Sequence, residues 1–279
     1  MVAFHRTLLC RVALLAVGAI GAGCGSDKNA SQQEAPAPRD ARSAPEPAGE
    51  VDLPKEPRQT GTLSGTVVFQ GDAVPQETLI PIQTDSDYCR RHGKEGTYPK
   101  EDCLIDPDSR GIRNVIVYLQ GEALRDWPSA APQNIAIDNR NCRFEPHVNV
   151  SIVDSSVEVK NSDEIYHTTH LYGPPGFREF NPGMRTKGDS EKTILNRPGI
   201  YLVKCDRHGW MSAFLRVDRH PFQAVTGVKG HFQISGIPPG TYRVGMFHER
   251  FRPEPQDPKA TQVTIHADET ILVELELSE

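Results

Sequence analysis

The sequence has no surplus of positive charge, no long apolar run and little methionine. Its 279 residues include 31 lysines and arginines against 37 aspartates and glutamates, so the formal net charge is −6. Nothing resembles a basic patch that could neutralise phosphates, which argues against nucleic acid as a partner. No long stretch shows helical periodicity, whereas glycine and proline number 23 each. So many turn residues are typical of a protein built from short strands.

The N-terminal residues carry the signature of an export signal. His5 and Arg6 give a cationic start, and the apolar run Val12–Ile20 is too short to span a bilayer. The small residues that follow end at Cys24, as in a secretory signal peptide. This stretch is similar to a bacterial lipobox, which implies that residues 1–24 are a lipoprotein signal and that Cys24 is lipidated. An ordinary signal peptide without a lipid is the alternative.

Residues 25–59 look like a tether. They are rich in alanine and proline and almost without aromatic or β-branched residues, so they cannot bury enough apolar surface to offset the entropy of ordering. We expect a disordered arm that joins the lipid to a globular head. The glycine after Cys24, by resemblance to the bacterial sorting rule, implies an exported protein in the outer membrane, facing the periplasm.

After the tether, short runs of β-forming residues dominate, and turn residues separate most of them. The chain therefore reads as an all-β protein of the sandwich type. The predicted strands are Leu63–Phe69, Asn114–Leu119, His147–Val153, Ser156–Lys160, Lys192–Leu195, Ile200–Lys204, Ala213–Val217, His231–Ile234, Thr241–Phe247, Gln262–Ile265 and Ile271–Leu277.

Two segments far apart in the chain look like halves of one module. Gly61–Val68, with Asn114–Leu119, is similar to the opening of a carboxypeptidase regulatory-like (prealbumin-like) domain, and Thr226–Val244 is similar to its closing signature. Each half has too few strands for a stable sandwich. We therefore expect residues 60–130 and 219–279 to pair as one discontinuous β-sandwich, with residues 131–218 inserted as a second domain. The side chains expected in the shared core are Phe232, Ile234, Ile237 and Tyr242.

One loop between two predicted strands carries a compact set of soft metal ligands. Cys205 ends a strand, and His208 and Met211 follow before the next strand begins. Thiolate and thioether ligands select copper over hard cations, and a blue-copper site needs two histidines, one cysteine and a weak axial methionine. The loop supplies three of the four, so the second histidine must come from elsewhere. The alternative is a buried thiol or half of a disulfide beside ordinary loop and core residues.

The segment Val159–His170 also begins with a predicted strand and delivers His167 from its end. Together with the C-x-x-H-x-x-M spacing, this segment resembles the cupredoxins, and the short ligand loop is similar to that of amicyanin. The resemblance implies a Greek-key cupredoxin β-sandwich that holds one type 1 copper ion. It also implies that the ring of His208 lies near the surface. The ligands carried over by this resemblance are His167, Cys205 and His208 in the equatorial plane and Met211 as the axial ligand.

Other polar residues are expected around the ligands. Thr168 and Asp206 stand where cupredoxins often have a bonded Asn and Ser or Thr, so we expect the Thr168 hydroxyl to donate to the Asp206 carboxylate and tune the copper. His147 is expected near the copper if strands 147–153 and 156–161 form a hairpin; a solvent-facing histidine is the alternative. His170 should point away from His167, because side chains alternate along a strand.

The predicted export places the cysteines in an oxidising compartment, where disulfides persist. Two of the six fall in the signal, including Cys24. If Cys205 binds a metal, then Cys89, Cys103 and Cys142 remain, and one of them has no partner within the chain. Cys89–Cys103 and Cys89–Cys142 are both open as disulfides.

Electron transfer is the function that this ligand set favours, because a four-ligand copper site has no open position for a substrate. The expected partner is a redox protein such as a c-type cytochrome or a dehydrogenase, with the membrane reached through the lipid. A copper-binding or structural envelope module without redox turnover is the alternative. An enzyme such as a copper oxidase or nitrite reductase fragment would need a second copper site, for which only His147 and His170 are spare. The chain is therefore expected not to be an enzyme.

Overall fold

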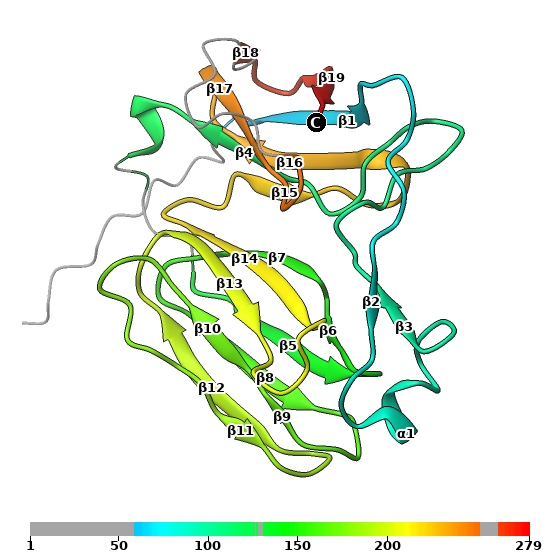
Figure 1. Ribbon diagram of the computed structural model, residues 1–279. Coiled ribbons are helices and arrows are strands. Elements are labelled where there is room, and N and C mark those ends of the chain that lie inside the picture. The colour runs from blue at the N-terminus through cyan, green and yellow to red at the C-terminus, as the bar shows by residue number, and fades with distance from the viewer. Residues whose placement is uncertain (1–58, 126, 128–130, 252–261) are drawn as a thin grey trace, which may run out of the picture. The chain divides into compact units, whose positions relative to one another are not determined.

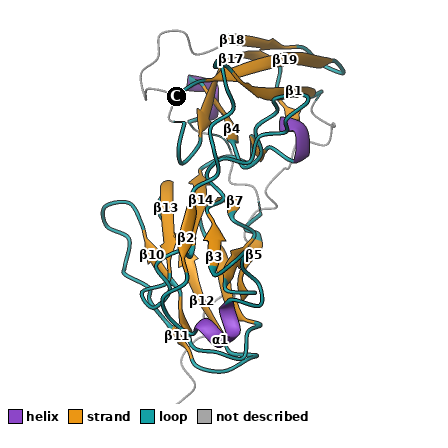
Figure 2. Ribbon diagram, turned by 45° about the vertical axis from the view of Figure 1, so that its right-hand side comes forward, coloured by secondary structure: helices purple, strands orange, loops and turns teal. Residues whose placement is uncertain are grey.

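A computed structural model describes residues 59–125, 127, 131–251 and 262–279. The predicted signal peptide, Cys24 and nearly all of the tether lie outside the described residues. Everything described belongs to one unit by its internal contacts, within Pro54–Glu279. Figure 2 shows strands and loops with only short helical turns, and α1 (Ser86–Cys89) has four residues. The all-β fold is confirmed, and the described chain contains no helix with the length and hydropathy of a membrane span.

The two ends of the described chain share one core, which we call the first sandwich. Its sheets have the orders β16–β1–β19 and β15–β4–β17–β18. The core contains all four side chains expected from the closing signature, with Ile237 fully buried and Tyr242 2% exposed. These strands are β1 (Gly61–Phe69), β4 (Ile116–Gln120), β15 (Gln223–Val225), β16 (His231–Ile237), β17 (Gly240–Phe247), β18 (Gln262–Ile265) and β19 (Thr270–Leu277).

A second core lies between two further sheets, with the orders β10–β13–β14–β7 and β12–β8–β5–β6, and the short pair β9–β11 adjoins them. We call strands β5 to β14 the second sandwich (Figure 1). Strict alternation of buried residues along β8 and β14 gives each strand one core face. The strands are β5 (Asn134–Arg140), β6 (Arg143–Glu145), β7 (Val148–Ile152), β8 (Ser155–Asn161), β9 (His167–Thr168), β10 (His170–Tyr172), β11 (Gly183–Met184), β12 (Ser190–Leu195), β13 (Gly199–Lys204) and β14 (Ser212–Asp218).

The segment between β1 and β4 departs from the expected division. It carries β2 (Leu79–Pro81), α1 and β3 (Thr97–Pro99), and its residues Ile82, Cys89 and Tyr98 belong to the core of the second sandwich. The sequence placed all of residues 60–130 in the outer domain. Two contacts explain the difference: a disulfide links Cys89 to Cys142, and the ring of Tyr98 stacks on Trp210 at 5.7 Å. The resemblance of the first sandwich to a prealbumin-like domain stays a prediction.

The expected hairpin of β7 with β8 is wrong. β7 pairs in parallel with β14, whereas β8 pairs with β5 and β12 in the opposite sheet. Asp154, with φ of 65°, turns the chain from one sheet to the other. Both strands bury apolar side chains, and a sandwich covers those faces by placing them in opposing sheets.

Candidate metal centre

The loop between β13 and β14 holds Cys205, His208 and Met211 in a tight conformation. The Met211 N–H donates to the His208 carbonyl at 2.9 Å, and the Cys205 N–H donates back to the Met211 carbonyl at 3.4 Å. Met211 is 2% exposed and belongs to the same core as Cys205 and Trp210. The loop therefore fixes its side chains through its own backbone. The axial role of Met211 stays a prediction.

His167, at the start of β9, reaches the same point from the other side. Its Nδ1 lies 4.0 Å from Cys205 Sγ, and His208 Nδ1 lies 3.4 Å from that sulfur. All three donor atoms fall within 4.8 Å of one another, and both histidines are fully buried. Bonds from a metal of about 2.3 Å to sulfur and about 2.0 Å to nitrogen place the two donors about 3.6 Å apart. The spacing fits one metal ion with all three side chains.

The surroundings of Cys205 favour its thiolate. Burial alone raises the pKa of this thiol, but hydrogen bonds from His167, His208 and the Thr168 N–H lower the pKa to about 5. The Thr168 N–H lies 3.4 Å from the sulfur. Because the thiolate is the form that binds metals, the site is prepared for a soft ion at neutral pH.

Asp163 holds the outer nitrogen of His167 and was not singled out from the sequence. Its Oδ2 accepts from His167 Nε2 at 3.0 Å and from the Cys142 N–H at 2.8 Å. Its Oδ1 accepts from the Asn141 N–H at 2.7 Å and from the Tyr88 hydroxyl at 3.2 Å. Burial raises the pKa of Asp163, but these bonds outweigh it and lower the pKa. Its place two residues after Asn161, in the segment that delivers His167, was the available signal.

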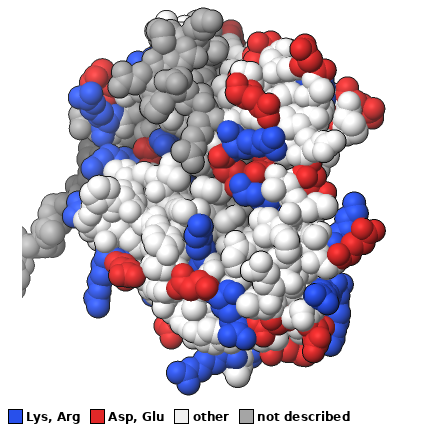
Figure 3. Space-filling model, viewed as in Figure 1, with Lys and Arg blue, Asp and Glu red and all other residues white. Residues whose placement is uncertain are grey.

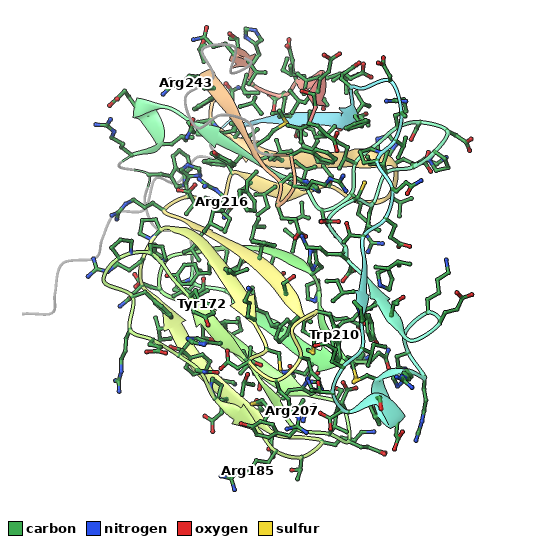
Figure 4. The ribbon with its side chains drawn as sticks, in the orientation of Figure 1. Tyr172, Arg185, Arg207, Trp210, Arg216 and Arg243 are labelled. Carbon is green, nitrogen blue, oxygen red and sulfur yellow. A yellow bond between two sulfur atoms is a disulfide. The ribbon has the colours of Figure 1, made fainter. Side chains whose placement is uncertain are left out.

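Asp85 holds the outer nitrogen of His208, and it too was not singled out from the sequence. Its Oδ2 lies 2.9 Å from His208 Nε2, and the Arg207 guanidinium binds the same carboxylate through two nitrogens. The Arg207 hydrogen bond is the main cause that lowers the pKa of Asp85 to about 2. The expected surface position of His208 is therefore wrong: the side chain is 0% exposed. Figure 4 shows Arg207 and Trp210 at the end of the second sandwich that faces α1.

The expected bond between Thr168 and Asp206 is present in a different form. The Asp206 backbone N–H donates to Thr168 Oγ1 at 2.7 Å, and the Thr168 hydroxyl donates to Cys205 Sγ at 3.8 Å and not to the carboxylate. The carboxylate of Asp206 instead accepts from Asn181 and contacts His170 Nδ1 at 3.3 Å. It turns toward the surface and is 46% exposed. His170 also meets Glu179, at 3.1 Å, and lies outside the group formed by His167, Cys205 and His208.

His147 is neither solvent-facing nor part of that group. Its ring is 5% exposed, and Nδ1 donates to the Ser212 carbonyl at 2.9 Å. Nε2 lies 2.5 Å from Oε1 of Glu249, a residue that follows β17 of the first sandwich. Burial lowers the pKa of His147, but the hydrogen bond and charge of Glu249 outweigh it, so the pKa is raised. The pair is a buried contact between the two sandwiches.

The structure decides between the two disulfides that the sequence left open. Cys89 and Cys142 form a disulfide, and Cys103 is free. A second group of metal-binding residue types, formed by Cys142, Asp163 and His167, also comes close together. The sulfur of Cys142 is bonded in the disulfide, and the carboxylate oxygens of Asp163 already accept four hydrogen bonds. That group therefore supplies no independent site.

The comparisons with known proteins assign no family to this chain. No family model matches the sequence, and no curated protein does. Among solved structures, a copper-containing nitrite reductase from Thermus scotoductus matches 33% of this chain at 22% identity and a TM-score of 0.29, and the chain spans 24% of that protein. A purple cupredoxin from Nitrosopumilus maritimus is matched over 98% of its length, and 30% of this chain, at 23% identity and a TM-score of 0.26.

A pseudoazurin from Sinorhizobium meliloti is matched over 73% of its length and 30% of this chain, at 21% identity and a TM-score of 0.27. With TM-scores of 0.26 to 0.29, these three likenesses assign no chemistry to this chain. The functional proposal therefore depends on the positions of this chain's own side chains.

Proposed function

We propose that this protein binds one copper ion in a type 1 centre and transfers single electrons. The observation that carries the proposal is the sulfur of Cys205 faced by the Nδ1 atoms of both His167 and His208 in a buried site. Met211, on the same loop, completes the set as the axial ligand. Copper supplies the redox chemistry, because it alternates between Cu(II) and Cu(I) by one electron.

The chain's own residues favour electron transfer over substrate chemistry. Cys205 is 4% exposed and both histidines are fully buried, so water and substrates have no direct access to the donor atoms. A rigid shell of ligands that barely moves between oxidation states suits a centre that only exchanges electrons. Catalytic copper chemistry needs a further site with open positions. The spare histidines, His147 and His170, are each engaged by carboxylates, which supports a protein that is not an enzyme.

One observation favours a second candidate, a copper-binding or structural module without redox turnover. His208 lies under Asp85 and Arg207, so the ring that could pass electrons to a partner is covered. Reduction and reoxidation kinetics separate the two functions, since a structural site exchanges electrons slowly with every donor and acceptor tried.

The setting of the proposed function follows from the N-terminal sequence. Cys24, in its lipobox-like context, supports an exported protein held by a lipid in the cell envelope, at the outer membrane facing the periplasm. A redox protein such as a c-type cytochrome or a dehydrogenase is the proposed partner. Acidic and basic side chains are interspersed on the face in Figure 3. Such a mixed surface suits brief encounters better than a nucleic-acid partner.

The test is to load the protein with Cu(II) and to record visible and electron paramagnetic resonance spectra. We expect an intense thiolate-to-copper band with narrow hyperfine splitting, absent in Cys205→Ser and retained in Cys103→Ser. Cys103 is the matched control because it is the other free cysteine of the described residues. A colourless copper complex, or no binding, contradicts the type 1 assignment. A blue protein that no small reductant turns over favours the structural alternative.

A further inference from the structure

In both histidines of the candidate metal centre, the ring nitrogen that faces away from Cys205 contacts a carboxylate. Asp163 accepts from Nε2 of His167, and Asp85 meets Nε2 of His208. A carboxylate oxygen accepts a hydrogen bond from the ring nitrogen that it faces, so each Nε2 carries a proton and each Nδ1 is the nitrogen left to bind the metal. The two carboxylates come from different parts of the chain. Asp163 precedes its histidine by four positions, whereas Asp85 lies 123 positions before His208.

The segment Thr84–Cys89 reaches both carboxylate contacts. Thr84 Oγ1 donates to the Arg207 carbonyl at 3.1 Å, and Asp85 binds the Arg207 side chain and the His208 ring. At the other end of the segment, the Tyr88 hydroxyl donates to Asp163, and Cys89 is bonded to Cys142, whose N–H also donates to Asp163. One short segment thus binds the outer nitrogen of His208 directly and reaches that of His167 through Asp163.

The backbone at Asp85 is adapted to this role. Its φ and ψ of 46° and 37° are left-handed, a conformation that asparagine, aspartate and glycine tolerate better than other residues. The carboxylate is 22% exposed and the ring it covers is fully buried. The sequence resemblance implied an open edge at this ring, and the segment is what closes it.

We propose that Asp85 is a positioning residue of the copper centre, which fixes the ring of His208 and, with the segment Thr84–Cys89, closes its outer edge. This inference rests on the proposed function for its copper readouts. A carboxylate bonded to Nε2 makes the imidazole a stronger donor, and so it stabilises Cu(II) relative to Cu(I) and lowers the reduction potential. The closed edge also slows copper loss and slows electron exchange with small reagents.

Two substitutions suit the left-handed backbone and separate the effects. Asp85→Asn keeps an oxygen acceptor for His208 but removes the negative charge. Asp85→Gly removes the side chain and opens the edge without backbone strain. Asp87→Asn is the matched control, because Asp87 is an exposed acid on α1 two residues away.

The first measurement needs no copper. In metal-free protein, nuclear magnetic resonance of the His208 ring should show a slowly exchanging Nε2 proton in the wild type and in Asp87→Asn. We expect exchange to become at least about tenfold faster in Asp85→Gly. Equal exchange rates in the wild type and Asp85→Gly overturn the positioning role, whether or not the protein proves to be a copper protein.

The second measurement uses the Cu-loaded protein. We expect Asp85→Asn to raise the reduction potential, and Asp85→Gly to lower copper affinity about 10–100-fold and to speed reduction by a small inorganic reductant. Loss of stability alone would leave the potential of the copper-bound fraction unchanged, so an unchanged potential in both variants overturns the proposal. If the wild type shows no Cys205-dependent band, the proposed function has failed, and the exchange measurement still decides the role of Asp85.

Discussion

The carboxylate of Asp163 joins the disulfide loop to the ring of His167, with its Oδ2 3.0 Å from the ring Nε2. The same carboxylate accepts hydrogen bonds from the backbone N–H groups of Asn141 and Cys142, and the side chain of Cys142 forms a disulfide with Cys89. The orientation of a predicted copper ligand therefore depends on a loop closed by a disulfide between two separate parts of the chain.

Asp163→Asn should weaken both the fold and the site. All four groups that contact Asp163 donate, so an asparagine amide would place its own N–H groups against donors. We expect a loss of about 1–3 kcal/mol in the free energy of unfolding, measured with urea on metal-free protein. Copper affinity, measured by competition with a chelator, should fall about 10–100-fold. The neighbouring exposed Glu164→Gln is the control, and equal effects in both variants would contradict the role of Asp163.

The thiol of Cys205 should titrate far below an ordinary cysteine. Its pKa is lowered to about 5, because the hydrogen bonds from the two histidines and the Thr168 N–H outweigh burial. Burial instead raises the pKa of the Cys103 thiol. Ultraviolet thiolate absorbance of metal-free Cys103→Ser should rise as the pH increases through about 5, and Cys205→Ser should lack this step. Protons should compete with copper at lower pH. A single step at alkaline pH in both variants would show that the site does not activate Cys205.

The sequence was sufficient for the strands that alternate regularly and for the residues of the ligand loop. The predicted strand Gln262–Ile265 coincides with β18, and the alternating runs around Cys205 match β13 and β14 within one residue at each end. Cys205 and His208 lie on one loop, so their proximity follows from local sequence alone. His167 could be found because it follows strand β8, in the segment whose sequence resembles the first-ligand segment of cupredoxins.

What the sequence could not supply depends on contacts between distant segments. Asp85 lies just before a four-residue helix with no periodicity, and it contacts a ring 123 positions later in the chain. The burial of His208 follows from that placement. The role of Glu249 could not be predicted either, because its partner His147 lies 102 positions earlier in the chain, in the other sandwich. Short strands such as β9 and β11, of two residues each, carry too little pattern to be predicted.

Substitution of Asp206 should affect the copper less than the sequence predicted, whereas substitution of Thr168 should weaken the fold. The Asp206 carboxylate points to Asn181 and His170, so Asp206→Asn should leave the copper spectrum and potential nearly unchanged. Thr168→Val removes the acceptor of the Asp206 N–H and should cost about 1–3 kcal/mol in the free energy of unfolding. Spectra, potentiometry and urea unfolding of both variants check this. A large shift in potential in Asp206→Asn would restore the carboxylate as the group that tunes the copper.

The contact between His147 and Glu249 makes stability depend on pH in a definite direction. The raised pKa of His147 means that its contribution is complete below its ordinary value of 6.5 and is lost as the pH rises through the raised value. Burial raises the pKa of Glu249, but the hydrogen bond and charge of His147 outweigh it and lower the pKa, so its contribution is complete above 4.5 and is lost at more acidic pH. The pair therefore stabilises most between these two values.

Glu249→Ala should be strongly destabilising, and more so in weak acid than in alkali. The side chains of His147 and Glu249 are 5% and 7% exposed, so the variant leaves a buried imidazolium with only Glu101, 3.6 Å from its Nδ1, as a carboxylate neighbour, at a cost of about 3–5 kcal/mol. Lys100, 3.5 Å from Glu249, loses a partner as well. Urea unfolding at about pH 5.5 and about pH 9 should show a smaller difference from the wild type at the higher pH, where His147 is neutral in the unfolded chain. Glu274→Ala, an exposed acid of β19, is the control. A difference that is constant across this range would mean that the pair acts by packing, with no transfer of charge between folded and unfolded states.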